Sequence, residues 1–219
     1  MDDLLKKFYH KSFYNIDKNI LHFEISPALK SHLRYFMEEF PEANYIHIVR
    51  DPRSHVRSGV NWVSDKPVNR FFKLNIPYWS PKPPSYPYLG ENKQDKIFKI
   101  SLQNWIDSHT TLLGMRQMTS NYKLLKFEDL IQNPFNFIED ILSFNNYALD
   151  KNKEDILQAN ISSASKNTSH KVFPDWHKWE DKYILYLYRQ CDSLMKELGY
   201  GLEAEWQERV RNALNSSDN

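Results

Sequence analysis

Basic and hydroxyl side chains gather in the segment 50–58, RDPRSHVRS, directly after a short apolar stretch. Arg50 follows a predicted buried strand, at the edge where open α/β sheets bind ligands. Asp51-Pro52 is a typical helix start, and the backbone N–H groups of a helix start favour an anion. The planar guanidinium of Arg50 matches a phosphate, and Ser58, seven residues after Asp51, adds a hydroxyl donor. The pattern predicts a phosphate-binding site at Arg50 and Ser58.

The same residues also allow a purely structural interpretation. Arg50 then pairs with a carboxylate at the start of the helix, and Ser58 is an ordinary surface hydroxyl. Because Arg-Asp-Pro is a common turn from a strand into a helix, the residue types alone leave both interpretations open.

Other candidate side chains have weaker patterns. Glu24 ends a predicted strand, but the helix start beside it stabilises a carboxylate without any catalysis, so we do not assign it as a general base. His170 and His177, with Asp175 between them, match no standard metal-binding spacing. Cys191 is the single cysteine, which excludes an intrachain disulfide and a thiolate metal cluster. We therefore expect no metal ion.

The elements that position segment 50–58 alternate between strands and helices. Residues 19–25 (NILHFEI) predict a short strand, and Ser26-Pro27 predicts the start of a helix that Pro41 ends. Residues 45–49 (YIHIV) are apolar and β-branched, which indicates a buried parallel strand. A helix follows from residue 52. This order is typical of an α/β domain.

The second half of the chain repeats the alternation after a loop rich in proline and aromatic residues within 65–93. The apolar spacing predicts these further elements: helices over roughly 96–118, 134–144 and 184–198 and a strand over 122–127. Trp105 points inward on the first of these helices, and Gly199 has the position of a C-cap glycine after the last. We find no repeat and no linker, so residues 1–219 are predicted to form a single domain.

The composition excludes several classes of protein. Hydrophobic residues make up 41% and charged residues 26% of the 219 residues, which supplies a sizeable core and excludes a disordered or collagen-like chain. The formal net charge of +1 gives no bulk attraction to nucleic acid or to an anionic membrane surface. No run of about 18 apolar residues occurs, and the acidic start is unlike a signal peptide. We therefore expect a cytoplasmic protein.

Glycine is scarce, with five residues in all and none among the first 58. Phosphate-binding loops and dinucleotide fingerprints need glycine for a positive φ and for close approach of the backbone to the ligand. Neither motif therefore lies in the N-terminal quarter. The sequence patterns typical of Walker NTPases, serine hydrolases and zinc proteases are also missing.

Four segments in a consistent order resemble the sulfotransferases, which transfer a sulfuryl group from 3′-phosphoadenylyl sulfate (PAPS). The segment IHIVRDPRSHVRSGVNW is similar to the family's 3′-phosphate-binding segment, and FEISPALKSHLRYFMEEFPEANYIHIV to the elements before it. KLLKFEDLIQNPFNFIEDILSF resembles the family's strand and helix around Tyr/Phe-Glu-Asp-Leu, and LMKELGYGL its closing helix with a Leu-Gly-Tyr end. The resemblance spans about Phe23 to Leu202.

The resemblance implies a three-layer α/β/α domain with a mostly parallel sheet, the P-loop-NTPase-like fold of sulfotransferases. It implies PAPS as sulfuryl donor, no metal, and Arg50 and Ser58 as ligands of the 3′-phosphate. Lys171 lies where the family closes a loop over the nucleotide, so it is a further candidate for that phosphate. The family's first strand and its 5′-phosphosulfate loop have no counterpart here, because nothing before Arg50 offers a glycine. The sequence therefore predicts a fragment or a truncated member.

Two functions follow from this resemblance. The first is sulfuryl transfer to a hydroxyl or amine acceptor, which is a carbohydrate or another hydroxyl compound, with the general base unassigned. The second is a non-catalytic module that keeps the nucleotide site or serves as an interaction surface. A nucleotide or sugar kinase is disfavoured by the missing phosphate loop. Loss of the first strand is expected to expose a sheet edge and to favour self-association.

Overall fold

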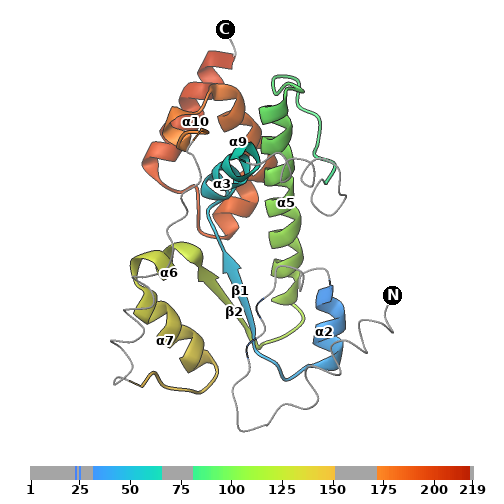
Figure 1. The fold of residues 1–219 in the computed structure, drawn as a ribbon, viewed down its shortest axis with the longest axis vertical. Helices are drawn as coiled ribbons and strands as arrows, with labels where there is room; N and C mark the ends of the chain where they lie inside the picture. Colours follow the sequence, from blue (N-terminus) through green and yellow to red (C-terminus); the bar gives the residue numbers. More distant parts are fainter. Residues whose placement is uncertain (1–22, 24, 26–31, 66–80, 151–171, 218–219) are drawn as a thin grey trace. The chain divides into compact units, whose positions relative to one another are not determined.

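The computed structural model describes residues 23, 25, 32–65, 81–150 and 172–217. Contacts within the chain divide it into two compact units, Met1–Phe40 and Pro41–Asn219. Figure 1 shows the described elements coloured along the chain from α2 to α10. No helix in these ranges has the length and apolar character needed to cross a membrane.

The first unit contributes one described helix, α2 (Leu33–Glu39). Its buried residue Phe36 contacts the rings of Tyr35 and Phe40, with centroid distances of 5.5 and 6.2 Å. The helix ends before Pro41, as predicted. The predicted start of this helix and the predicted strand over 19–25 lie outside the described residues, apart from Phe23 and Ile25.

The second unit contains two parallel strands, β1 (Tyr45–Val49) and β2 (Tyr122–Lys126), which pair in register along their whole length. The bounds of β1 are those predicted, and β2 ends one residue early because Phe127 begins a helix. Val49 is fully buried whereas its neighbour Ile48 is 40% exposed, so the two faces of β1 differ. The described ranges form a mixed α/β structure that is mostly helical, with a small two-stranded parallel sheet.

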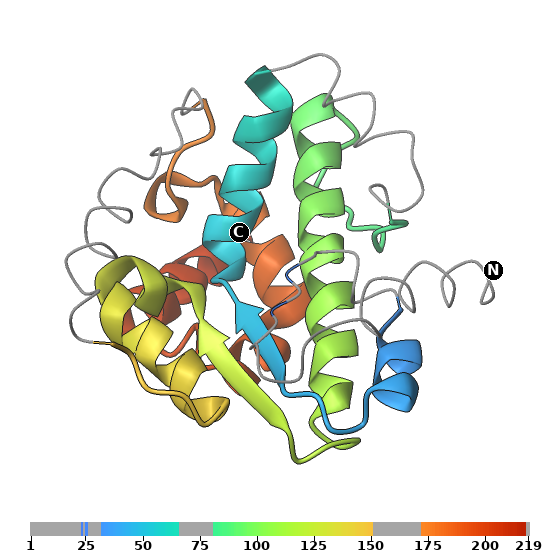
Figure 2. The same cartoon turned by 60° about the horizontal axis from the view of Figure 1, so that its bottom comes forward.

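Helix α3 (Pro52–Asp65) leaves the carboxyl end of β1 and packs along α5 (Lys93–Met115), as Figure 2 shows. Gly59 permits this close packing, because a Cβ atom there would lie 2.6 Å from Ser101 Oγ. The start of α3 agrees with the prediction. Helix α5 begins and ends three residues earlier than predicted, because Asn92 caps its start.

Strand β2 leads directly into α6 (Phe127–Gln132), which is followed by α7 (Pro134–Phe144). The bounds of α7 are those predicted from its opening proline and its apolar stripe. Because β1 and β2 are parallel, their carboxyl ends meet at one edge of the sheet. The starts of α3 and α6 are therefore brought together there.

The C-terminal part contains the 3₁₀-helix η3 (Trp176–Lys178) and helices α9 (Asp181–Glu197) and α10 (Ala204–Ser217). The last predicted helix is confirmed as α9, and Gly199 follows its C-cap in the left-handed conformation with φ of 77°. Helix α10 was not predicted, although its buried residues have helical spacing: Trp206, Val210 and Ala213.

Aromatic side chains dominate the core that α3, α5, α9 and α10 share. The largest fully buried side chains include Trp105, Trp206, Tyr183, Tyr186 and Phe98. Several of these rings meet edge to face, an arrangement that complements their charge distribution. The inward position predicted for Trp105 is confirmed.

Candidate functional site

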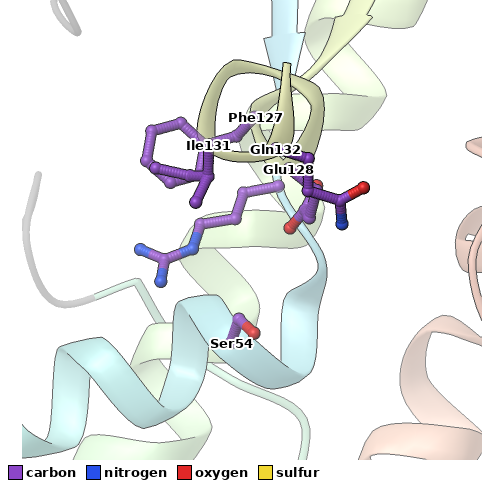
Figure 3. A pocket seen from close by; sticks show the side chains of 6 residues that line it. Ser54, Phe127, Glu128, Ile131 and Gln132 are labelled. Carbon is purple, nitrogen blue, oxygen red and sulfur yellow. The ribbon is translucent and has the colours of Figure 1, made fainter. Parts of the chain in front are cut away.

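A pocket of about 160 Å³ lies at the carboxyl ends of β1 and β2, between the starts of α3 and α6. Its lining combines a cation, two apolar side chains, a carboxylate, a hydroxyl and an amide: Arg50, Phe127, Ile131, Glu128, Ser54 and Gln132. In Figure 3, Ser54 on α3 lies opposite the side chains of α6. A cation next to apolar and hydroxyl groups suits an anionic ligand that also carries a ring.

Arg50 is fixed through its backbone and left available through its side chain. Its carbonyl oxygen accepts a hydrogen bond of 2.8 Å from Trp105 Nε1. Its guanidinium carbon lies 5.1 Å from the centroid of the Phe127 ring, a cation–π distance that leaves the N–H fork open. Within the described part of the chain, no ion pair engages the Arg50 guanidinium.

Arg53, three residues later, forms ion pairs with the carboxylates of Asp51 and Glu203. Its Nη2 lies 2.6 Å from Asp51 Oδ2 and 2.9 Å from Glu203 Oε1, and its side chain is only 3% exposed. The guanidinium carbon also lies at cation–π distances from Trp176 and Trp206, 4.9 and 5.0 Å from their ring centroids. The structural interpretation offered for Arg50, a pair with the carboxylate at the helix start, describes Arg53 instead.

The first amides of α3 already have carboxylate partners. The Asp51 N–H donates to Glu128 Oε1 at 3.0 Å, and the Arg53 N–H donates to Asp51 Oδ1 at 2.8 Å. The anion attraction expected from these two N–H groups is therefore satisfied within the protein. Binding of an external phosphate here depends on Arg50 and on hydroxyl donors.

Glu128 is the acidic group of the pocket, and both of its carboxylate oxygens have donors. Oε1 accepts from the Asp51 N–H, and Oε2 accepts from the Tyr200 hydroxyl at 2.7 Å. Burial, and then the hydrogen bond to this carboxylate, raises the pKa of Tyr200 well above its ordinary value. Tyr200 therefore remains a hydroxyl donor near pH 7.

The structure places Ser54 in the pocket and Ser58 one turn further along the same face of α3. Ser58 is half-buried and does not line the pocket itself. Sequence reasoning missed Ser54, although its four-residue spacing from Ser58 was a signal that both hydroxyls face one side of the helix.

Lys171 lies outside the described residues, but the chain just after it is held on α3. Asn61 accepts a hydrogen bond of 2.7 Å from the Phe173 N–H and donates one of 3.2 Å to the Phe173 carbonyl. Asn61 is 4% exposed and follows Ser58 by three residues. The segment that leaves Lys171 thus reaches α3 within one turn of Ser58.

The remaining candidates are Glu24, His170, Asp175 and His177. Glu24 and His170 lie outside the described residues. His177 contacts the carboxylate of Asp175, and Glu205 lies 3.4 Å from its other ring nitrogen. The hydrogen bond that His177 donates to the Asp175 carboxylate raises the pKa of His177. Across the described ranges, no three His, Cys, Asp or Glu side chains are arranged to hold a metal ion.

A buried histidine pair, His47 and His109, was not predicted. His47 on β1 lies 2.6 Å from the Tyr122 hydroxyl and 2.7 Å from His109 Nδ1 on α5. The ring of His109 in turn contacts Trp105, the residue that holds the Arg50 carbonyl. Burial lowers the pKa of His47 to about 4, so this side chain is neutral in the folded protein near pH 7.

The comparison with protein families gives one match. The model described as "Sulfotransferase family" matches residues 1–151, which include Arg50, Ser58 and all residues that line the pocket. Helices α9 and α10 lie beyond the matched residues. No curated protein matches the chain, and no solved structure matches it.

Proposed function

The chain belongs to the sulfotransferase family, and from this premise we propose that it binds PAPS through a 3′-phosphate site at Arg50 and Ser58 and transfers the sulfuryl group to a hydroxyl or amine acceptor. The proposal extends to the whole chain as a single domain with the three-layer α/β/α sulfotransferase fold, of which β1 and β2 form part of the sheet. A carbohydrate or another hydroxyl compound is the proposed acceptor. The cytoplasmic location and the self-association through a sheet edge stay predictions.

The observation that carries this proposal is the contrast between Arg50 and the carboxylates around it. Asp51 and Glu203 pair with Arg53, and Glu128 has donors on both oxygens. A guanidinium at the end of a parallel strand, next to a pocket and without a carboxylate partner among the described residues, is suited to an incoming phosphate. The Phe127 ring beside it offers an apolar face to a nucleotide.

Two further groups support the 3′-phosphate assignment. Ser54 and Ser58 place two hydroxyl donors on the face of α3 that starts beside Arg50. Lys171 enters the proposal because Phe173, two residues later, is bound to Asn61 close to Ser58. A lysine supplies a second cation for a phosphate dianion.

The proposed reaction is an in-line displacement at sulfur. The acceptor oxygen or nitrogen forms a bond to sulfur while the bond from sulfur to the bridging phosphate oxygen breaks. Adenosine 3′,5′-bisphosphate leaves with the electron pair of that bond, and the acceptor loses a proton to a base or to water. The described residues named above hold the nucleotide, and none of them is assigned as the base.

Calorimetric titration with adenosine 3′,5′-bisphosphate, and with adenosine 5′-monophosphate for comparison, tests the site directly. Because a charge-assisted hydrogen bond contributes about 1.5–3 kcal/mol, Arg50→Ala is expected to weaken bisphosphate binding about ten- to a hundredfold. The matched control is Arg211→Ala, which removes the same charge from an exposed position on α10.

Equal weakening by Arg50→Ala and Arg211→Ala, or equal affinity of the wild type for both nucleotides, would contradict a 3′-phosphate site at Arg50. Bisphosphate binding without turnover of PAPS in the presence of carbohydrate, phenol and amine acceptors would instead favour a non-catalytic nucleotide-binding module.

A further inference from the structure

The Leu-Gly-Tyr segment after α9 turns the chain back to the ends of the two strands. Gly199 has φ of 77°, and a Cβ atom on it would lie 2.9 Å from Lys126 Nζ. The turn is closed by the Tyr200 N–H, which donates to the Met195 carbonyl at 2.8 Å. Lys126 Nζ then lies 4.7 Å from the centroid of the Tyr200 ring. These contacts leave Tyr200 5% exposed and hold it at the carboxyl end of β2.

The Tyr200 hydroxyl has one strong partner, the Glu128 carboxylate. It lies 2.7 Å from Glu128 Oε2 and 3.4 Å from the Val49 carbonyl, so its single proton goes to the carboxylate. The Asp51 N–H occupies the other oxygen at 3.0 Å. Two donors from two separate elements therefore orient Glu128.

This orientation matters because Glu128 and Arg50 line the same pocket. Opposite charges that line one pocket attract each other, and a carboxylate and a guanidinium can form a bidentate pair when nothing else holds them. An arginine in a bidentate pair has fewer N–H groups left for a phosphate. Asp51 and Glu203 do not compete with a phosphate for Arg50, because both carboxylates pair with Arg53.

We infer that Tyr200 is a positioning residue that holds the Glu128 carboxylate away from Arg50 and so keeps Arg50 available to a phosphate. The identity of the ligand rests on the proposed function, whereas the orientation of Glu128 does not. The inference also gives a role to a residue that lies beyond the part of the chain matched by the family.

The substitution Tyr200→Phe removes only the hydroxyl and keeps the ring beneath Lys126. We expect it to weaken adenosine 3′,5′-bisphosphate binding about three- to tenfold. This is the loss of affinity expected when Glu128 pairs with Arg50 in most molecules and only the remainder are competent to bind. Adding Glu128→Gln is expected to restore the affinity, and to tighten binding more in the Tyr200→Phe background than in the wild type. Tyr88→Phe, at a 60% exposed position, is the control for loss of a hydroxyl.

A second measurement needs no nucleotide. Thermal unfolding of Arg50→Gln, Glu128→Gln and the double variant is compared in the wild-type and Tyr200→Phe backgrounds. The Tm shifts are expected to depart further from additivity in Tyr200→Phe, where the two side chains pair, than in the wild type, where Tyr200 and the Asp51 N–H hold the Glu128 carboxylate.

The outcomes separate the inference from the proposed function. Unchanged binding by Tyr200→Phe, together with the same departure of the Tm shifts from additivity in both backgrounds, would overturn the positioning role. Weakened binding that Glu128→Gln does not restore would also overturn it, because the hydroxyl would then act only on the fold. If the wild type binds no bisphosphate, the proposed function fails, and the additivity of the Tm shifts alone decides the role of Tyr200.

Discussion

Arg50 and Arg53 lie three residues apart at the end of β1, and their surroundings differ in burial, charge and neighbours. Arg53 is 3% exposed, pairs with two carboxylates and makes cation–π contacts with two tryptophans. Arg50 borders an open pocket, contacts one phenylalanine ring and has no carboxylate partner within the described ranges. Two arginines three residues apart thus have different roles: Arg53 stabilises the fold, and Arg50 borders the pocket.

The difference shows where the protein places its negative charges. Of the carboxylates near these arginines, Asp51 and Glu203 neutralise the buried guanidinium, which cannot lose its proton. Burial works against the charge on Arg53, yet the hydrogen bonds with Asp51 and Glu203 raise its pKa further. Glu128 is held by neutral donors. The remaining positive charge, on Arg50, faces the pocket.

The largest expected effect comes from removing the buried arginine. Arg53→Leu leaves Asp51 partly buried without its cation, and loss of one partner of a buried pair costs about 3–5 kcal/mol. We expect the free energy of unfolding in urea to fall by this amount, while Arg50→Ala changes it by less than about 1 kcal/mol. A similar loss for both substitutions would show that Arg50 is structural as well.

Acidification tests a second buried basic side chain, His47, which stays neutral because burial lowers its pKa. Its pKa is lowered to about 4, against an ordinary value near 6.5 in the unfolded chain. The unfolded state therefore binds more protons between these two values, and stability falls as the pH drops from about 6.5 to 4.

The shift of His47 corresponds to at most about 3 kcal/mol of stability over that window. Urea unfolding measured at intervals between pH 7 and 4 detects it. The comparison variant is His47→Gln, which keeps a polar side chain without a titrating ring and should flatten the pH dependence. An unchanged slope in this variant would assign the acid sensitivity to other groups.

Local patterns predicted the frame of the site well. The strand β1, the start of α3 and the whole of α7 followed from short runs of β-branched residues and from Asp-Pro or Asn-Pro helix starts, which act over a few residues. Gly199 was recognised as a C-cap for the same reason. Arg50 was placed at the sheet edge because a strand end fixes its position.

Long-range partners were beyond the reach of the sequence. The pairing of Arg53 with Glu203 joins residues 150 positions apart, and that of Tyr200 with Glu128 joins residues 72 apart. The local sequence does not indicate which arginine pairs with the carboxylates. The interpretation that an arginine pairs with the carboxylate at the helix start was therefore offered for Arg50, whereas the structure shows this pair for Arg53. The pocket position of Ser54 rather than Ser58 likewise depends on where α6 lies.

The smallest expected effect distinguishes the two serines of α3. A neutral hydroxyl hydrogen bond contributes about 0.5–1.5 kcal/mol, so each removal weakens phosphate binding roughly two- to tenfold at most. If the phosphate lies within the pocket, Ser54→Ala weakens adenosine 3′,5′-bisphosphate binding and Ser58→Ala does not. If the phosphate lies further along α3, towards Asn61 and Phe173, Ser58→Ala has the larger effect. Calorimetric titration of both variants therefore locates the phosphate along the helix, with the affinity of Arg50→Ala as the lower reference. If both serine variants bind as tightly as the wild type, neither hydroxyl contacts the phosphate, and Arg50 is the sole ligand on this segment.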